Sequence, residues 1–222
     1  MAVEIDWFPL WLSLRVASLA TGLATVTGVA AAYLLARGPF RGRAVLEGLT
    51  SLPLTLPPTV LGYYLLVALG RQSAFGAWFE GVFGDPLVFT WRGAVVAATV
   101  PSIPLVARTT RAAFEDVEPG VLEAARIDGA GALQQLVRIL LPLSRRGIAA
   151  GVALGFARAL GDFGTTLMVA GNIPGRTQTL PIALYDAVQA GRWETAGILA
   201  VLLSVVSVAV LVVVARLGEQ GA

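Results

Sequence analysis

Residues 123–142 read EAARIDGAGALQQLVRILLP, a polar, arginine-bearing stretch between long apolar segments. Residues 122–127 are good helix formers, and glycines at positions 129 and 131 interrupt that helix. Residues 132–140 favour a second short helix. Pro142 is predicted to end it, because the residue before a proline is pushed out of the helical region. The stretch therefore predicts a compact protrusion of two short helices joined by a glycine bend.

The composition around this stretch is typical of a membrane protein. Hydrophobic residues make up 56% of the 222 residues and charged residues only 14%. The apolar runs are long enough to cross a hydrocarbon core of about 30 Å, which takes roughly 20 helical residues. We predict an all-α, polytopic protein with a single transmembrane domain over residues 1–222, which includes the polar segment 120–142. The five expected spans, with approximate ends, are residues 10–36, 45–69, 93–113, 147–170 and 196–217.

Residues 70–92, between the second and third predicted spans, have a mixed character. They read GRQSAFGAWFEGVFGDPLVFTWR and combine aromatic residues with glycine and charge. This mixture suits an interfacial helix on the outer surface, since aromatic side chains favour the membrane–water boundary. A re-entrant segment or a sixth span is the alternative.

The arginines predict an orientation in the membrane. Ten of the 16 basic residues lie on one side, at positions 37, 41, 43 and 216 and at six positions from 108 to 146. The opposite loops hold only Arg71, Arg92, Arg176 and Arg192, and the N-terminus carries Glu4 and Asp6. Cytoplasmic loops carry the basic excess, so we expect the N-terminus outside, and the C-terminus and segment 120–142 in the cytoplasm. The first apolar segment lacks a preceding basic region and predicts a retained span rather than a cleaved signal.

Residues that the chain lacks exclude several kinds of chemistry. The sequence has no Cys and no His, which excludes disulfides, thiolate chemistry and histidine bases or metal ligands. It contains no GxxxxGK[ST] phosphate loop, which an ATP-hydrolysing chain of that class would need, and no GxSxG elbow. The net charge of +2 is too small to indicate a nucleic-acid partner. We expect no catalytic residue, no metal site and no enzyme activity; a membrane enzyme and a structural scaffold are the competing classes.

Prolines interrupt two of the predicted spans. Residues 52–64 read LPLTLPPTVLGYY, and in the third span Pro101 and Pro104 flank Ser102. A proline removes a backbone donor and frees a carbonyl, which is tolerated at membrane depth where protein or water satisfies that carbonyl. These segments predict kinks toward a cavity, with simple packing kinks as the alternative. The candidate pathway or gate residues here are Thr55, Pro57, Pro58, Thr59 and Ser102.

The fourth predicted span holds Arg158 and Asp162, two charges within the membrane. Four residues apart, they share one helical face and are able to pair. Charges at that depth cost about 2.5 to 3.5 kcal/mol each, so they are expected to face the bundle interior or a partner subunit. We favour a structural ion pair over direct substrate contact. Thr165 and Thr166 follow as candidate pore-lining groups.

The 123–142 stretch resembles the EAA signature of ABC importer permeases. The matching positions are Glu123, Ala124, Ala125, Gly129, Ile139, Leu141 and Pro142. Four runs, at residues 52–66, 90–98, 123–142 and 156–185, are together similar to the molybdate ABC transporter permease family along nearly the whole chain. The sequence departs from that family at Ile127 and Asp128, where an acidic group is able to alter the contact with the ATPase.

The resemblance implies a fold, a function and partners. The fold is that of type I ABC importer permeases, in which cytoplasmic coupling helices dock on the ATPase. The function is import of molybdate, with tungstate or sulfate/thiosulfate as the alternative. The implied partners are a second copy of the chain, two ABC ATPase subunits that bind ATP and Mg, and a periplasmic or extracellular oxyanion-binding protein. The location is the cytoplasmic (inner) membrane of a bacterium or archaeon, in contact with lipid.

Overall fold

The computed structural model describes residues 6–36, 38 and 40–219, with side chains as far as Val213. Every regular element in these ranges is a helix. Glu4, Arg37 and the side chain of Arg216, which entered the predicted orientation, lie outside the described residues.

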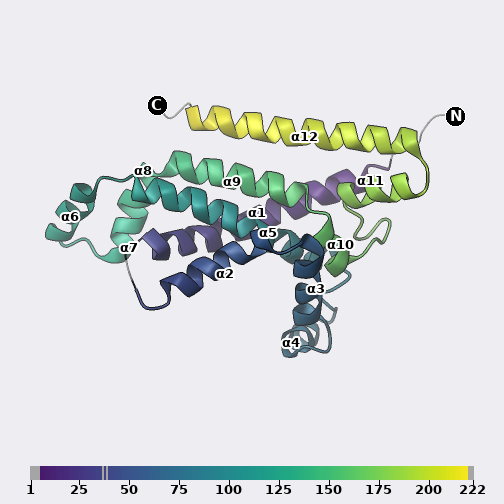
Figure 1. Cartoon of the computed structure of the whole chain (residues 1–222), viewed down its shortest axis with the longest axis horizontal. Coiled ribbons are helices and arrows are strands. Elements are labelled where there is room, and N and C mark those ends of the chain that lie inside the picture. Colours follow the sequence, from purple (N-terminus) through teal and green to yellow (C-terminus); the bar gives the residue numbers. More distant parts are fainter. Residues whose placement is uncertain (1–5, 37, 39, 220–222) are drawn as a thin grey trace.

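Three helices form the centre of the molecule: α1 (Phe8–Ala36), α5 (Trp91–Glu115) and α9 (Arg145–Leu160). Small residues allow them to pack closely, since Ala17, Ala20 and Ala98 are fully buried between them. The long α12 (Trp193–Glu219) lies along α9, and α11 (Leu180–Gln189) precedes it (Figure 1). The sequence prediction did not include α11.

The second predicted span, residues 45–69, is not one continuous helix. It consists of α2 (Arg43–Thr55) and α3 (Pro58–Leu69), with a bend of 116° between them. Leu56 is extended because it precedes a proline, and neither Pro57 nor Pro58 has an N–H to continue the hydrogen-bond ladder. The chain therefore turns away from the bundle at this point, and α3 carries α4 (Ala74–Phe83) to its far end (Figure 1).

The fourth predicted span, residues 147–170, is also divided. α9 ends at Leu160, and after a break at residues 161–163 the chain forms the short α10 (Gly164–Ala170). The helix predicted between residues 70 and 92 is present as α4, where the hydroxyl of Ser73 accepts the N–H of Gly76. Its placement at the membrane surface stays a prediction.

By length and composition, two described helices are able to cross a membrane, α1 and α12. The number rises to four if two bent pairs of helices each count as one span. One pair is α2 with α3, and the other is the two helical segments on either side of Ser144. Five spans therefore stay a prediction. The segment before Ser144 meets α9 at 78°.

The polar stretch forms a chain of short helices at one end of the bundle, where Figure 1 shows α6 and α7 projecting from it. They are α6 (Pro119–Ile127), α7 (Ala132–Gln135), the π-helix η1 (Leu136–Leu140) and α8 (Leu141–Leu143). The prediction that Pro142 ends the second helix is wrong, because the helix continues to Leu143. The π-turn explains why: the N–H of Leu141 donates to the carbonyl of Leu136, and this wider winding accommodates a proline that has no N–H of its own.

Candidate functional site

The EAA protrusion, residues 119–143, presents its signature unevenly. Glu123, Ala124, Gly129 and Pro142 are exposed, while Ala125, Ile139 and Leu141 are half-buried. The bend between α6 and α7 depends on Gly129, whose φ of +86° lies in the left-handed region. The N–H groups of Gly129 and Ala130 close the end of α6 on the carbonyls of Arg126 and Ala125, at 3.0 and 2.8 Å.

Sequence reasoning assigned no role to two apolar residues on this protrusion: Ile127 was named only as a departure from the family, and Leu133 was not named. Ile127 is 86% exposed and Leu133 is 73% exposed, one on each side of the glycine bend. Large apolar side chains exposed so fully are typical of an interaction site rather than of a solvated loop. The sequence does contain a signal for this site: Ile127 and Leu133 are large apolar residues, and each lies two positions from a glycine of the bend.

The protrusion is fixed to the bundle and does not hang from a flexible loop. Phe114 of α5, Ala32 of α1 and Leu140 form a buried cluster that Leu136 and Ile148 extend. Polar contacts add to it: the Tyr33 hydroxyl donates to the carbonyl of Ala132 at 3.0 Å, and the Ser144 hydroxyl to that of Ala113 at 2.9 Å. The protrusion therefore contacts α1, α5 and α9 directly.

The break between α9 and α10 is organised by one buried carboxylate. Asp162 has a side chain only 1% exposed, and its Oδ1 accepts from Nη1 of Arg158 at 2.9 Å. Its Oδ2 accepts from the backbone N–H and the hydroxyl of Thr166 at 2.9 and 2.7 Å. The predicted ion pair is thus present, and the same carboxylate caps the first turn of α10.

The two interrupted spans meet at these breaks. The Thr165 hydroxyl lies 3.4 Å from the carbonyl of Pro58, one of the first residues after the α2–α3 break. A Cβ at Gly164 would lie 2.9 Å from Cβ of Pro58, and one at Gly62 would lie 2.7 Å from Cβ of Met168. Only glycine permits α3 and α10 to approach so closely.

The other predicted pathway residues are placed differently. Thr55 and Thr59 are exposed on either side of the break, together with Pro57, whereas Thr165 and Thr166 are buried. Ser102 is fully buried and donates to the carbonyl of Ala98 within its own helix. The structure therefore brings Gly164 and Thr165, which follow Asp162, against the α2–α3 break, whereas the hydroxyl of Ser102 serves α5 itself.

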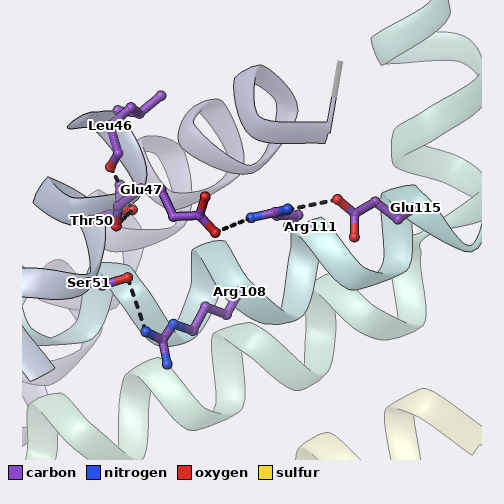
Figure 2. A network of polar contacts seen from close by, with 7 residues as sticks. All are labelled: Leu46, Glu47, Thr50, Ser51, Arg108, Arg111 and Glu115. Carbon is purple, nitrogen blue, oxygen red and sulfur yellow. Dashed lines mark hydrogen bonds and ion pairs between the residues drawn. The ribbon is translucent and has the colours of Figure 1, made fainter. Parts of the chain in front are cut away.

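A second polar network joins α2 to α5 nearer the protrusion (Figure 2). Arg111 donates to Glu47 of α2 and to Glu115 of α5, both at 2.8 Å. Arg108 donates to the hydroxyl of Ser51 at 3.0 Å. Sequence reasoning used these arginines only to predict the orientation. Their spacing of three places both on one face of a helix, and this was the available signal that they contact a neighbouring helix.

Arg15 is a further charge that the sequence prediction overlooked. It lies within the first predicted span, which therefore also contains a charge. Its guanidinium carbon is 3.9 Å from the ring centre of Trp91 and 5.2 Å from that of Trp11. Cation–π contact with two tryptophans makes a charge in this position less costly.

Comparison with known proteins places this geometry in context. The family described as "Binding-protein-dependent transport system inner membrane component" matches residues 24–221. The molybdenum transport system permease protein ModB of Escherichia coli (strain K12) is 41% identical over 221 residues, 98% of this chain and 96% of that protein. ModB of Haemophilus influenzae is 43% identical over 187 residues, 84% of this chain and 81% of the relative.

Two further comparisons are more distant. The sulfate transport system permease protein CysW of Synechocystis is 36% identical over 203 residues, which is 91% of this chain and 73% of that protein. Among solved structures, the inward-facing MetNI methionine ABC transporter matches with a TM-score of 0.76 and 19% identity over the full length of both chains. At that identity the likeness concerns the fold alone, which is that of type I ABC importer permeases.

Proposed function

Because the chain belongs to the family of binding-protein-dependent transport system inner membrane components, we propose that it is the permease subunit of an ABC importer for molybdate. The observation that carries the proposal is the identity of 41% to a molybdenum permease over nearly the full length of both chains. Tungstate and sulfate/thiosulfate remain the alternative substrates. The sulfate permease relative is less similar and is matched over a smaller share of its length, which favours molybdate.

In the proposed complex two copies of this chain form one pathway, and each copy docks on an ATPase subunit. That subunit binds ATP and Mg, because this chain has no phosphate loop of its own. An external binding protein delivers the oxyanion. The N-terminus lies outside and the protrusion in the cytoplasm, as the distribution of arginines favours.

The coupling step follows from how the protrusion is attached. ATP binding draws the two ATPase subunits together and moves the docked protrusions, with Ile127 and Leu133 as apolar contacts on either side of Gly129. The protrusion joins α9 through the bend at Ser144, and α9 has 16 residues, about 24 Å at 1.5 Å per residue. The far end of α9 is the break that Asp162 holds. Movement of the protrusion thereby shifts the balance between inward-open and outward-open states.

The oxyanion requires transient hydrogen-bond donors along the pathway. Thr59, exposed just after the α2–α3 break, supplies a hydroxyl donor that binds without holding the anion too tightly for release. Thr55 is also exposed beside the break, but its hydroxyl donates to the carbonyl of Leu52 at 2.9 Å. Arg158 forms an ion pair with Asp162, which supports a role for Arg158 in shaping the break rather than in binding the anion.

The test is reconstitution. The chain is coexpressed with an ATPase subunit and the external binding protein, and the mass of the solubilised complex is measured together with ATP-driven uptake in proteoliposomes. We expect a complex of two permease and two ATPase subunits that accumulates molybdate. A complex without ATPase subunits contradicts the proposal. Uptake of sulfate in preference to molybdate would establish the alternative substrate.

A further inference from the structure

A cavity of about 1120 Å³ lies at the end of α5 that is opposite the EAA protrusion. Its walls come from three separate parts of the chain: the end of α3 with residues 70–73, residues 85–92, which lead into α5 and begin it, and the loop after α10 at residues 173–177. α5 has 25 residues, so its two ends are about 37 Å apart at 1.5 Å per residue.

Three arginines line this cavity, one from each part of its wall: Arg71, Arg92 and Arg176. Among the described residues, Arg71 pairs with Glu80 at 2.8 Å, whereas Arg92 and Arg176 have no carboxylate within 4.0 Å. Asp85 is the one acidic residue of the lining. The cavity therefore has an excess of positive charge, which attracts anions from solution.

A side-chain amide and a helix terminus add to this charge. Gln72 lines the cavity with its amide, whereas the hydroxyls of Ser73 and Thr90, which also line it, donate to the carbonyls of Ala68 and Leu87 at 2.6 and 2.7 Å. The Thr90 hydroxyl accepts from the N–H of Gly93 and starts α5, so the positive end of that helix dipole lies at the wall. The arginines, the Gln72 amide and the N-terminus of α5 together match an anion that accepts hydrogen bonds on several oxygens.

One residue of the cavity wall, Phe89, has an unfavourable backbone conformation. Phe89 has a φ of +58° and is the only described residue other than glycine with a positive value, a backbone conformation that is sterically unfavourable for a residue with a side chain. Its N–H donates to the carbonyl of Val169 at 2.9 Å, and its ring lies against Gly171. Strain that persists in one loop indicates a function that needs that loop shape.

We infer that this cavity holds a free tetrahedral oxyanion between its release by the external binding protein and its entry into the pathway, an inference that rests on the proposed function. Arg92 and Arg176 are its main charge partners, because neither is engaged by a carboxylate. The site lies at the outer end of α5, so it raises the local concentration of the anion before the pathway opens.

The chain has no cysteine, so Gln72→Cys provides a single thiol at the cavity wall. The purified complex is placed in phosphatidylcholine nanodiscs without binding protein, and the rate of thiol modification by an anionic sulfonate reagent is measured with increasing molybdate. The double variant Arg92→Gln with Arg176→Gln tests the site. Arg192→Gln is the matched control: Arg192 pairs with Asp186 at 2.7 Å and does not line the cavity.

Molybdate is expected to slow modification, and the half-protecting concentration in the double variant is expected to rise by roughly tenfold or more, as for the loss of a hydrogen bond to a charged group. The control keeps the wild-type value. In uptake, the double variant raises KM more than it lowers the maximal rate.

Two results overturn the inference. One is unchanged protection in the double variant while the wild-type complex still imports molybdate, which leaves the proposed function intact. The other is protection by phosphatidylglycerol in the nanodisc but not by molybdate, which assigns the cavity to a lipid phosphate. Absence of uptake in the wild type, with molybdate protection retained, contradicts the proposed function and not the anion site.

Discussion

At the scale of single residues, Asp162 illustrates how one carboxylate serves two structures. It neutralises Arg158 and also accepts both donors of Thr166, so α9 and α10 depend on the same side chain. A buried charge without its partner is costly, whereas a buried pair that is removed as a whole is often tolerated.

Asp162→Ala is therefore expected to destabilise the protein by about 3 to 5 kcal/mol, because it leaves Arg158 unpaired. Adding Arg158→Leu recovers part of that loss, but Thr166 still lacks its acceptor, which keeps a deficit of about 1 to 3 kcal/mol. The folded yield after detergent extraction measures all three variants. Strictly additive losses in the double variant would rule out the pairing.

The same set of variants separates a structural from a substrate role for Arg158. Uptake is measured with saturating binding protein and ATP. A double variant that folds well yet imports no oxyanion would assign Arg158 to the substrate, against our expectation.

Gly129 carries a second residue-level prediction. Its φ of +86° disfavours any side chain, although no atom lies within 4 Å of the position that a Cβ would occupy. Gly129→Val is expected to distort the bend and weaken ATPase association while membrane insertion is unchanged. Gly131→Val is the control, since Gly131 has equal space but a φ of −68°, which residues with a side chain adopt readily. Equal association for both variants would show that the left-handed bend is not required.

At the scale of elements, the two helix breaks are held together by close approach rather than by long side chains. α3 and α10 touch through Gly62 and Gly164, where an added Cβ would meet Met168 or Pro58 at under 3.0 Å. Helices whose backbones approach this closely make contact along a short interface, and this contact fixes the position of one break relative to the other.

Gly62→Ala is expected to reduce folded yield and lower the melting temperature, because the methyl group has no space between the helices. Gly22→Ala in α1 is the matched control, with no atom within 4 Å of the added Cβ within the chain. It is expected to be neutral or to stabilise by up to about 1 kcal/mol. Similar melting temperatures for both variants would argue against the close α3–α10 contact.

The network in Figure 2 predicts how α2 is held against α5. Glu47→Gln removes the cross-helix ion pair of Arg111, whereas Glu115→Gln removes only the pair within α5. Spin labels at Ala44→Cys and Ala112→Cys, both exposed, report the distance between the helices. We expect Glu47→Gln to broaden the distance distribution more than Glu115→Gln does. Identical distributions would mean that packing alone holds α2.

At the scale of the whole molecule, the surface is unusual for a soluble protein. Large apolar side chains are exposed along α12 and on α3 and α4, including Val201, Tyr63, Tyr64 and Trp78. Such a surface needs lipid or a further protein chain to cover it. Polar and charged groups gather instead at the protrusion and at the arginine cavity, at opposite ends of α5.

Because the protrusion and the cavity lie at opposite ends of α5, the orientation of the chain in the membrane is testable. Gln72→Cys at the cavity is expected to react with a membrane-impermeant thiol reagent in intact cells, and Gln134→Cys on the protrusion only in inverted vesicles. Both positions are exposed. The reverse pattern would place the N-terminus in the cytoplasm.

The sequence by itself determined the membrane class, the EAA protrusion and the family, because apolar run length, helix propensity and motif spacing are local properties of the chain. The pairing of Arg158 with Asp162 also followed from a spacing of four. What only the tertiary structure decided was non-local. The 116° turn after Leu56, the contact of Gly62 with Met168 and the cavity of three arginines each depend on segments far apart in sequence that packing brings together. Prolines in the sequence predict that a helix is interrupted, but the direction in which the chain continues is set by the helices that it must pack against.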